Sequence, residues 1–362
     1  MEKKIARNQI KKILSIDAVS GFAIGGAAWV ALLAARGFST VEIGLLESIF
    51  HITSMTFEIP SGVIADVFGR RKTMIASRVM VIISSLLMII SRNFFTVAIA
   101  ISASALSYNL ASGTREALAY DTLKEAGLEK EYDRFASNDL MIYQIFSSVG
   151  TLLAGVALVL GYRKANAVDA VIGAITVMIA FTLTEVHTKL HDVTSVSERF
   201  KETIQSSTSF IKESRKARLI ILFNGLVGAV DVLVLFFLQA KLPAVGLNKL
   251  WLGPALFAMG IGAAAGAKAT EYFNEKNYRR IGVLCAVGVS LSFASVFTGN
   301  YYLMILGGFI GAFSDNFLQV RTDVFLNSMI PSEQRATLMS VNSFAFSIIM
   351  IILSPIFGLL VT

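Results

Sequence analysis

Charged residues and cysteine are both scarce in this chain of 362 residues. Only 16% of the residues are charged, against about 25% in soluble domains, and 55% are apolar. This composition excludes a water-soluble fold, because a chain of this size could not hide so much apolar surface. The single cysteine, Cys285, excludes a disulfide framework and a zinc cluster.

Several catalytic patterns are also missing from the sequence. It contains no phosphate-binding Gly-x-x-x-x-Gly-Lys loop, no nucleophile triad and no metal-ligand spacing. We therefore expect neither an enzyme nor an ATP-driven pump, and we expect no cofactor and no metal site.

The apolar residues are gathered in stretches long enough to cross a hydrocarbon core of roughly 30 Å. The sequence therefore predicts an all-α polytopic membrane protein. Eleven spans are expected, at roughly 13–35, 42–65, 73–91, 94–118, 136–161, 166–184, 217–240, 249–270, 278–298, 301–325 and 337–360.

One long polar stretch, residues 185–216, separates two halves. We expect an N-terminal bundle of six helices over 1–184, a cytoplasmic linker over 185–216, and a C-terminal bundle over 217–362 with five helices. The halves resemble each other: Gly37 and Gly44 at the start of the second span match Gly246 and Gly253 at the start of the eighth. Such a repeat is typical of transporters built from duplicated bundles.

Lys and Arg are distributed unevenly over the connecting segments. The N-terminus and every second loop hold most of them, whereas the opposite loops hold six: Arg36, Arg92, Arg163, Lys164, Lys241 and Lys249. This bias predicts a cytoplasmic N-terminus and linker in a cell membrane. It also explains the net charge of +7 without a nucleic-acid partner.

The loop between the second and third spans reads Gly62-Val63-Ile64-Ala65-Asp66-Val67-Phe68-Gly69-Arg70-Arg71-Lys72. It is short and basic, and it lies between two apolar runs. It closely resembles the loop 2–3 signature of the major facilitator superfamily. Span order, the central linker and the repeat extend this resemblance over the whole chain.

The resemblance implies two six-helix bundles related by pseudo-symmetry around a central cavity, which is lined by helices 1, 4, 7 and 10. It also implies alternating access for a small-molecule substrate. A twelfth span is expected by analogy but is missing after the eleventh. The fifth helix lacks the Gly-Pro pair of the family's drug–proton antiporters, which argues against antiport. A monomer is expected.

The basic loop suggests a gate. Asp66 could accept hydrogen bonds from Arg70 or Arg71, or lie at the positive N-terminus of another helix, with Gly62 as a point of close helix approach. Such contacts would form in one conformation and break in the other. Gly69 also favours the gate. The alternative is that the cations Arg70, Arg71 and Lys72 only set the topology.

Charged residues within spans form a second group of candidates. A charge facing lipid at the bilayer centre costs roughly 2.5–3.5 kcal/mol or more, so such residues are expected to face a partner or a cavity. Every helix assigned to the cavity carries at least one. We take them as candidates for substrate binding or ion coupling, with structural neutralisation as the alternative: Asp17, Arg115, Glu116, Asp231 and Asp315.

The second span adds Glu47, His51 and Glu58. Their spacings of four and seven place them on one helical face. A histidine beside a carboxylate suits proton coupling. A polar contact between helices explains the same pattern equally well.

Together these features favour a secondary active transporter that exports amphiphilic small molecules, with a proton gradient as a candidate energy source. An apolar cavity with few charges suits amphiphiles better than sugars, for which more Asn, Gln and Trp would be expected. Two alternatives remain open. One is an uptake or exchange permease for a small metabolite, and the other is a truncated, non-transporting membrane protein.

Overall fold

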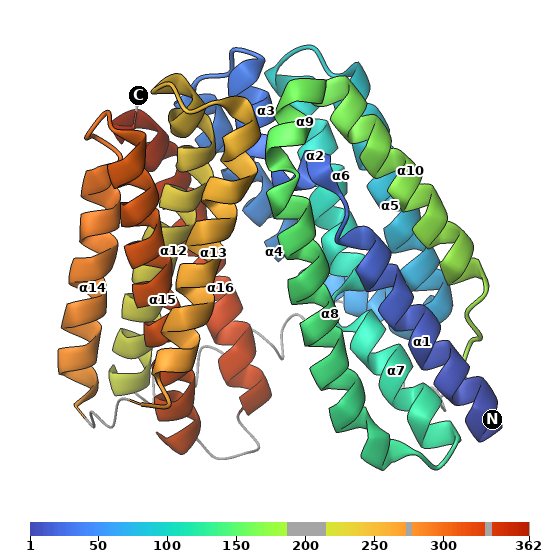
Figure 1. Ribbon diagram of the computed structural model, residues 1–362. Helices are drawn as coiled ribbons and strands as arrows, with labels where there is room; N and C mark the ends of the chain where they lie inside the picture. Colours follow the sequence, from blue (N-terminus) through green and yellow to red (C-terminus); the bar gives the residue numbers. More distant parts are fainter. Residues whose placement is uncertain (187–214, 273–276, 330–334, 362) are drawn as a thin grey trace. The chain divides into compact units, whose positions relative to one another are not determined.

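The structure is a computed structural model that describes residues 1–186, 215–272, 277–329 and 335–361. All regular secondary structure in these ranges is helical (Figure 1). Most of the predicted linker lies outside the described residues.

The described helices follow the predicted spans in order. In the first half they are α1 (Lys3–Ser20), α2 (Ile24–Ala27), α3 (Trp29–Ala35), α4 (Thr40–Phe68), α5 (Arg70–Ile90), α6 (Phe94–Ala111), α7 (Thr114–Glu125), η1 (Glu129–Glu131), α8 (Tyr132–Leu152), α9 (Ala154–Leu160) and α10 (Tyr162–Phe181). In the second half they are α12 (Arg215–Ala244), η2 (Lys249–Trp251), α13 (Leu252–Ala269), α14 (Tyr278–Ser295), α15 (Tyr301–Met329) and α16 (Arg335–Leu360).

The predicted all-α membrane class is confirmed. Within the described residues, seven helical segments are long and apolar enough to cross a membrane, and an eighth is possible if the pair bent by 42° between Leu152 and Ala154 counts as one span. Three predicted spans fall outside this set. The span expected at 13–35 is divided among three helices, α1, α2 and α3. The span at 42–65 lies in α4, which carries several acidic residues, and the span at 278–298 lies in α14, which has two arginines directly after Tyr278.

The chain divides into two compact units. Unit 1 comprises Met1–Trp29 and Ile52–Arg199, and unit 2 comprises Val30–His51 and Phe200–Thr362. Residues 30–51 therefore pack with the second half, whereas the sequence places them in the N-terminal bundle. The helix α4 passes from one unit to the other near His51. The predicted bundle boundaries remain a prediction.

The break after α1 is stabilised by a carboxylate. Gly21 packs against the backbone of α8 at Phe146, where a Cβ atom would not fit. Beyond the break, Asp169 on α10 accepts hydrogen bonds from the N–H groups of Gly25 (3.0 Å) and Gly26 (2.8 Å). These N–H groups begin a short helix and have no intrahelical acceptor, so Asp169 satisfies donors that would otherwise be costly in a membrane.

Close helix packing in unit 2 depends on a Gly-x-x-x-Gly pair. Gly262 and Gly266 on α13 lie one turn apart and face the backbone of α15 at Phe309 and Phe313. A Cβ atom at Gly262 would lie 2.6 Å from the Phe309 carbonyl oxygen. Small residues at this spacing allow two helices to approach at backbone distance, which compensates for the weak hydrophobic driving force in lipid.

Candidate functional site

Arg115 is the centre of a charge cluster in unit 1. Its guanidinium binds Asp17 on α1 at 3.0 Å, its neighbour Glu116 at 2.6 Å, and Asp139 on α8 at 3.1 Å. The Arg115 side chain is 25% exposed, and Asp17 and Asp139 are more deeply buried. Three carboxylates thus share one cation, which supports the structural alternative for Asp17, Arg115 and Glu116.

A second arginine completes this cluster. Arg78 on α5 donates hydrogen bonds to Ser20 Oγ (3.1 Å) and Ser77 Oγ (3.0 Å), and it interacts electrostatically with Asp17. The cluster therefore joins α1, α5, α7 and α8 through two cations and three carboxylates. A network of this kind can rearrange as one unit when a charge enters or leaves it.

The basic loop makes its ion pairs within unit 1. Arg70 pairs with Asp121 on α7 and donates to the Ala117 carbonyl at 2.8 Å. Asp66 is exposed and interacts electrostatically with Arg70, and its role in a gate stays a prediction. Lys72 is exposed.

Arg71 contacts the end of the sixth span. Its guanidinium donates to the Phe181 carbonyl at 2.7 Å, and its backbone N–H donates to Glu185 Oε1 at 3.2 Å. Gly69 has φ of +97°, and a Cβ atom there would collide with the Glu185 carboxylate. The loop requires glycine at this position for both reasons.

The close helix approach expected at Gly62 is not present among the described residues. Gly62 is exposed, and within these residues a Cβ atom there would have no neighbour within 4 Å. At Gly69 a Cβ atom would meet the Glu185 carboxylate, which is a side-chain contact and not a close approach of two helices.

The polar residues of α4 separate into two groups. Glu47 contacts His51 at 3.3 Å, and His51 Nδ1 lies 3.3 Å from Ser347 Oγ on α16; all three residues belong to unit 2. Glu58 is half-buried and belongs to unit 1. Residues on one face of α4 therefore belong to two different units.

Asp231 and Asp315 face each other's helices in unit 2. A Cβ atom at Gly311 on α15 would lie 2.6 Å from Asp231 Oδ1, and one at Gly228 on α12 would lie 3.3 Å from Asp315 Oδ1. Each carboxylate thus occupies the space left by a glycine on the other helix. Asp231 is 2% exposed and Asp315 is 9% exposed, and the two interact electrostatically.

The Asp231 carboxylate is incompletely satisfied. Within the part of the chain that the structure describes, its Oδ1 atom is buried and has no hydrogen-bond donor. Burying a carboxylate without a partner costs several kcal/mol, on the order of the charge penalty in a membrane. A proton, a cation or a substrate group could offset that cost.

Asp315 also lines a cavity of about 300 Å³ between α12, α15 and α16. Five polar side chains line its wall: Asn224, Asp315, Gln319, Asn342 and Ser343. Asn224 is held in place by Thr322, whose hydroxyl donates to Asn224 Oδ1 at 3.0 Å. The side chains of Val232 and Phe346 form an apolar part of the cavity wall. This combination can bind a small solute through hydrogen bonds and one apolar face.

Sequence reasoning named Asp231 and Asp315 but missed several of their counterparts in unit 1. Asp139 and Asp121 were not among the site candidates, although each pairs with an arginine. Asp169 and Glu185 were not singled out. An acidic residue inside a span is the signal that could have identified Asp169.

Among the described residues, no group of three or more His, Cys, Asp or Glu side chains could hold a metal ion.

Comparison with known proteins agrees with this fold. The family model described as Major Facilitator Superfamily matches residues 13–294. A search of the curated proteins finds no significant match.

Solved structures with the same fold include the nucleoside transporter NupG (TM-score 0.74, 14% identity, covering 97% of this chain and 90% of that one). A bacterial homologue of the human lysosomal transporter Spinster, inward-facing and unoccupied, gives a TM-score of 0.75 at 14% identity over 98% and 82% of the two chains. The xylose transporter XylE from E. coli gives 0.65 at 13% identity over 96% and 89%. These identities show the fold alone. The family match over most of the sequence shows that this chain belongs to the major facilitator superfamily.

Proposed function

We propose that this protein is a secondary active transporter of a cell membrane that moves a small polar solute by alternating access, driven by a proton. The observation that carries the proposal is the cavity in unit 2, where three amides and the Asp315 carboxylate converge. Amide and carboxylate groups of this kind suit a solute rich in hydroxyl or ring-nitrogen groups. NupG is a nucleoside transporter and the D-xylose–proton symporter has the same fold, which supports this substrate class.

Asp231 is proposed as the coupling residue. It lies against Gly311, one helical turn from Asp315 on α15, and its buried Oδ1 lacks a donor among the described residues. A proton bound in one conformation and released in the other would supply the missing charge compensation.

Export of amphiphilic compounds is the second candidate. It is supported by the apolar part of the same wall, at Val232 and Phe346. We place it second because polar groups outnumber apolar ones around the cavity.

Transport into proteoliposomes with an imposed proton gradient tests the proposal. Labelled nucleosides and pentoses are the probes for uptake, and ethidium is the probe for export. We expect gradient-dependent accumulation of a nucleoside or a pentose, and Asp315→Asn should lower it about tenfold or more. Asp231→Asn should keep solute exchange but lose the response to the gradient.

Asp323→Asn is the matched control, since Asp323 lies on an exposed side of α15. Movement of ethidium alone would favour the second candidate. No movement of any probe by folded protein would contradict both and favour a non-transporting role.

A further inference from the structure

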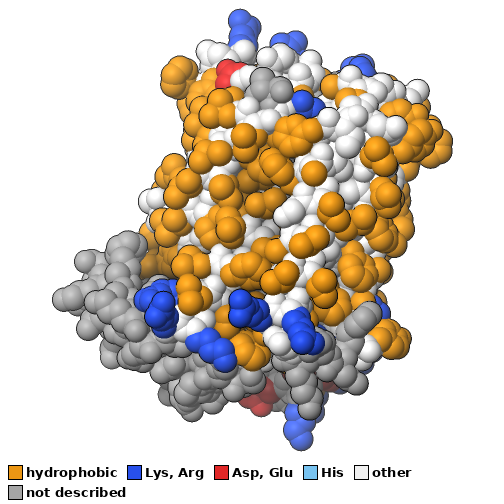
Figure 2. All heavy atoms as spheres, turned by 90° about the vertical axis from the view of Figure 1, so that its left-hand side faces the viewer, with side chains coloured by type: hydrophobic (Ala, Val, Ile, Leu, Met, Phe, Trp, Pro, Cys, Tyr) orange, Lys and Arg blue, Asp and Glu red, His pale blue; other side chains and the backbone are white. Residues whose placement is uncertain are grey.

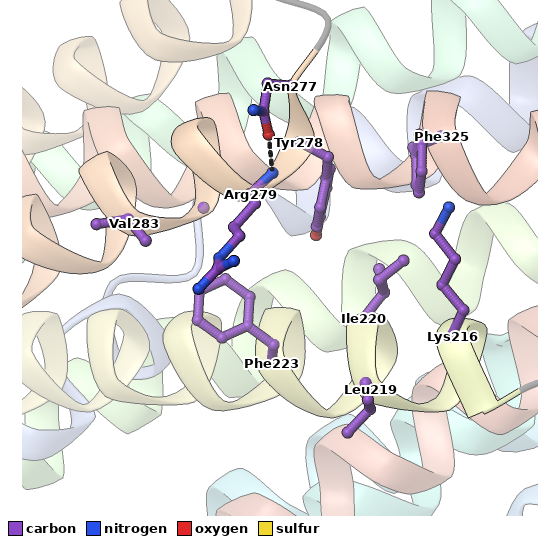
Figure 3. A pocket seen from close by; sticks show the side chains of 10 residues that line it. Lys216, Leu219, Ile220, Phe223, Asn277, Tyr278, Arg279, Val283 and Phe325 are labelled. Atoms are coloured by element: carbon purple, nitrogen blue, oxygen red, sulfur yellow. Dashed lines mark hydrogen bonds between the residues drawn. The ribbon is translucent and has the colours of Figure 1, made fainter.

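A second pocket in unit 2 lies at the surface, where α12 begins and α14 begins, and has a volume of about 670 Å³ (Figure 3). Its rim carries two cations, Lys216 on α12 and Arg279 on α14. Its floor and far side are apolar, with Leu219, Phe223 and Val283. The pocket therefore combines two cationic side chains with an apolar lining.

The Lys216 ammonium is held in place by an aromatic stack. It lies 4.9 Å from the ring centroid of Phe325 on α15. Phe325 in turn stacks on Tyr278 at 5.0 Å, with an interplanar angle of 13°. The Tyr278 hydroxyl is fixed by Thr322 Oγ1 at 2.7 Å. Three helices thus position one cation, which is more order than a solvated surface lysine needs.

Arg279 is placed on the opposite side of Tyr278 from Lys216 (Figure 3). The Asn277 side chain accepts a hydrogen bond from the Arg279 backbone N–H at 3.1 Å, which fixes the start of α14. The guanidinium extends toward Phe223 (Figure 3). The pocket therefore carries one cation on each side of Tyr278, and each can form charge-assisted hydrogen bonds with an anionic group.

The surroundings of the pocket are those of a membrane interface. Figure 2 shows the face that includes α14, where apolar side chains cover much of the surface and Lys and Arg side chains lie toward both ends. The exposed residues Val283, Leu284, Val287 and Leu291 continue the apolar surface along α14. The charge distribution of the loops predicts that the end at which α12 and α14 begin is cytoplasmic, where anionic lipids reside.

We propose that this pocket binds an anionic phospholipid, with its phosphate between Lys216 and Arg279 and an acyl chain against Leu219, Phe223 and Val283. Charge complementarity selects the headgroup, and the apolar groove selects a lipid over a free anion. The pocket shares no lining residue with the polar cavity at Asp315, so lipid binding can be measured apart from solute binding.

Lipid binding to the purified full-length protein in detergent, followed by native mass spectrometry, tests the proposal. Phosphatidylglycerol should bind about tenfold or more tightly than phosphatidylcholine, since basic residues near a membrane surface attract anionic lipids. The Lys216→Gln/Arg279→Gln variant should lose this preference.

The Arg215→Gln/Arg280→Gln variant is the matched control. It removes the same charge from adjacent exposed positions of the same two helices, neither of which lines the pocket. It should keep the preference. Equal loss in both variants would overturn the proposal, because it would reduce the effect to general surface charge. Equal binding of the two lipids by the unmodified protein would also overturn it.

A second pair of variants tests the acyl chain. Leu219→Ala should weaken phosphatidylglycerol binding about threefold or more, whereas Leu222→Ala, exposed on the same helix outside the pocket, should not. Glycerophosphate, which has the headgroup anion without the chains, should fail to displace the lipid at equal concentration. Displacement by glycerophosphate would identify a simple anion site and overturn the lipid assignment.

Discussion

Arg115 shows how one side chain can neutralise a membrane-embedded cluster. It contacts Asp17, Glu116 and Asp139, and no single contact accounts for its position. The reason is electrostatic: three carboxylates without a cation would repel one another in a medium of low dielectric constant.

Arg115→Ala should therefore destabilise the protein strongly. Removing one partner of a buried ion pair leaves uncompensated charge and costs about 3–5 kcal/mol. Thermal unfolding in detergent measures the effect. Arg92→Ala, at an exposed position, should change the unfolding temperature little, and a similar drop in both variants would contradict the role of the cluster.

Replacing Asp231 should change the stability of the protein in the opposite direction. Its buried oxygen lacks a donor within the described residues, so Asp231→Asn should stabilise the folded protein by about 1–3 kcal/mol while impairing gradient-driven transport. The same unfolding assay and the proteoliposome assay measure the two effects. A variant that is both less stable and inactive would indicate a structural role for this carboxylate.

At the scale of elements, the contact between α13 and α15 depends on glycine. Gly266 faces the Phe313 backbone so closely that any side chain would separate the helices. Gly266→Ala should cost about 1–3 kcal/mol through overpacking. Unfolding in detergent is again the measurement, and Gly260→Ala on the same helix is the control, because a Cβ atom there meets nothing within 4 Å. Equal changes in stability of the two variants would contradict a special packing role for Gly266.

The helix α4 shows why a shared face does not imply a shared site. The spacing of Glu47, His51 and Glu58 is correct for one face, and the first two do meet. Glu58 belongs with the other unit because the helix is long enough to serve both. Periodicity predicts which side of a helix a residue occupies, but it contains no information about which neighbour lies there.

At the scale of the whole molecule, the distribution of Lys and Arg predicts a membrane topology with a cytoplasmic N-terminus. Cysteine labelling can test this topology, because only one native cysteine, Cys285, has to be replaced first. In a Cys285→Ala background, Arg163→Cys and Lys249→Cys should react with an impermeant maleimide added to intact cells. Lys3→Cys and Arg215→Cys should react only after permeabilisation. All four positions are exposed, so accessibility in the folded chain does not limit labelling. The reverse pattern would contradict a cytoplasmic N-terminus.

The sequence by itself determined the membrane class, the order of the spans, the family and the identity of most charged candidates. These follow from length, hydropathy and local motif, which are properties of neighbouring residues. The tertiary structure decided which charges meet. It joined Arg70 to Asp121, surrounded Arg115 with three carboxylates, and set Asp231 and Asp315 against glycines of each other's helices. Apart from the neighbours Arg115 and Glu116, these pairs join residues 24 to 98 positions apart in the chain. Helix packing, which depends on backbone approach and side-chain volume, selects such pairs.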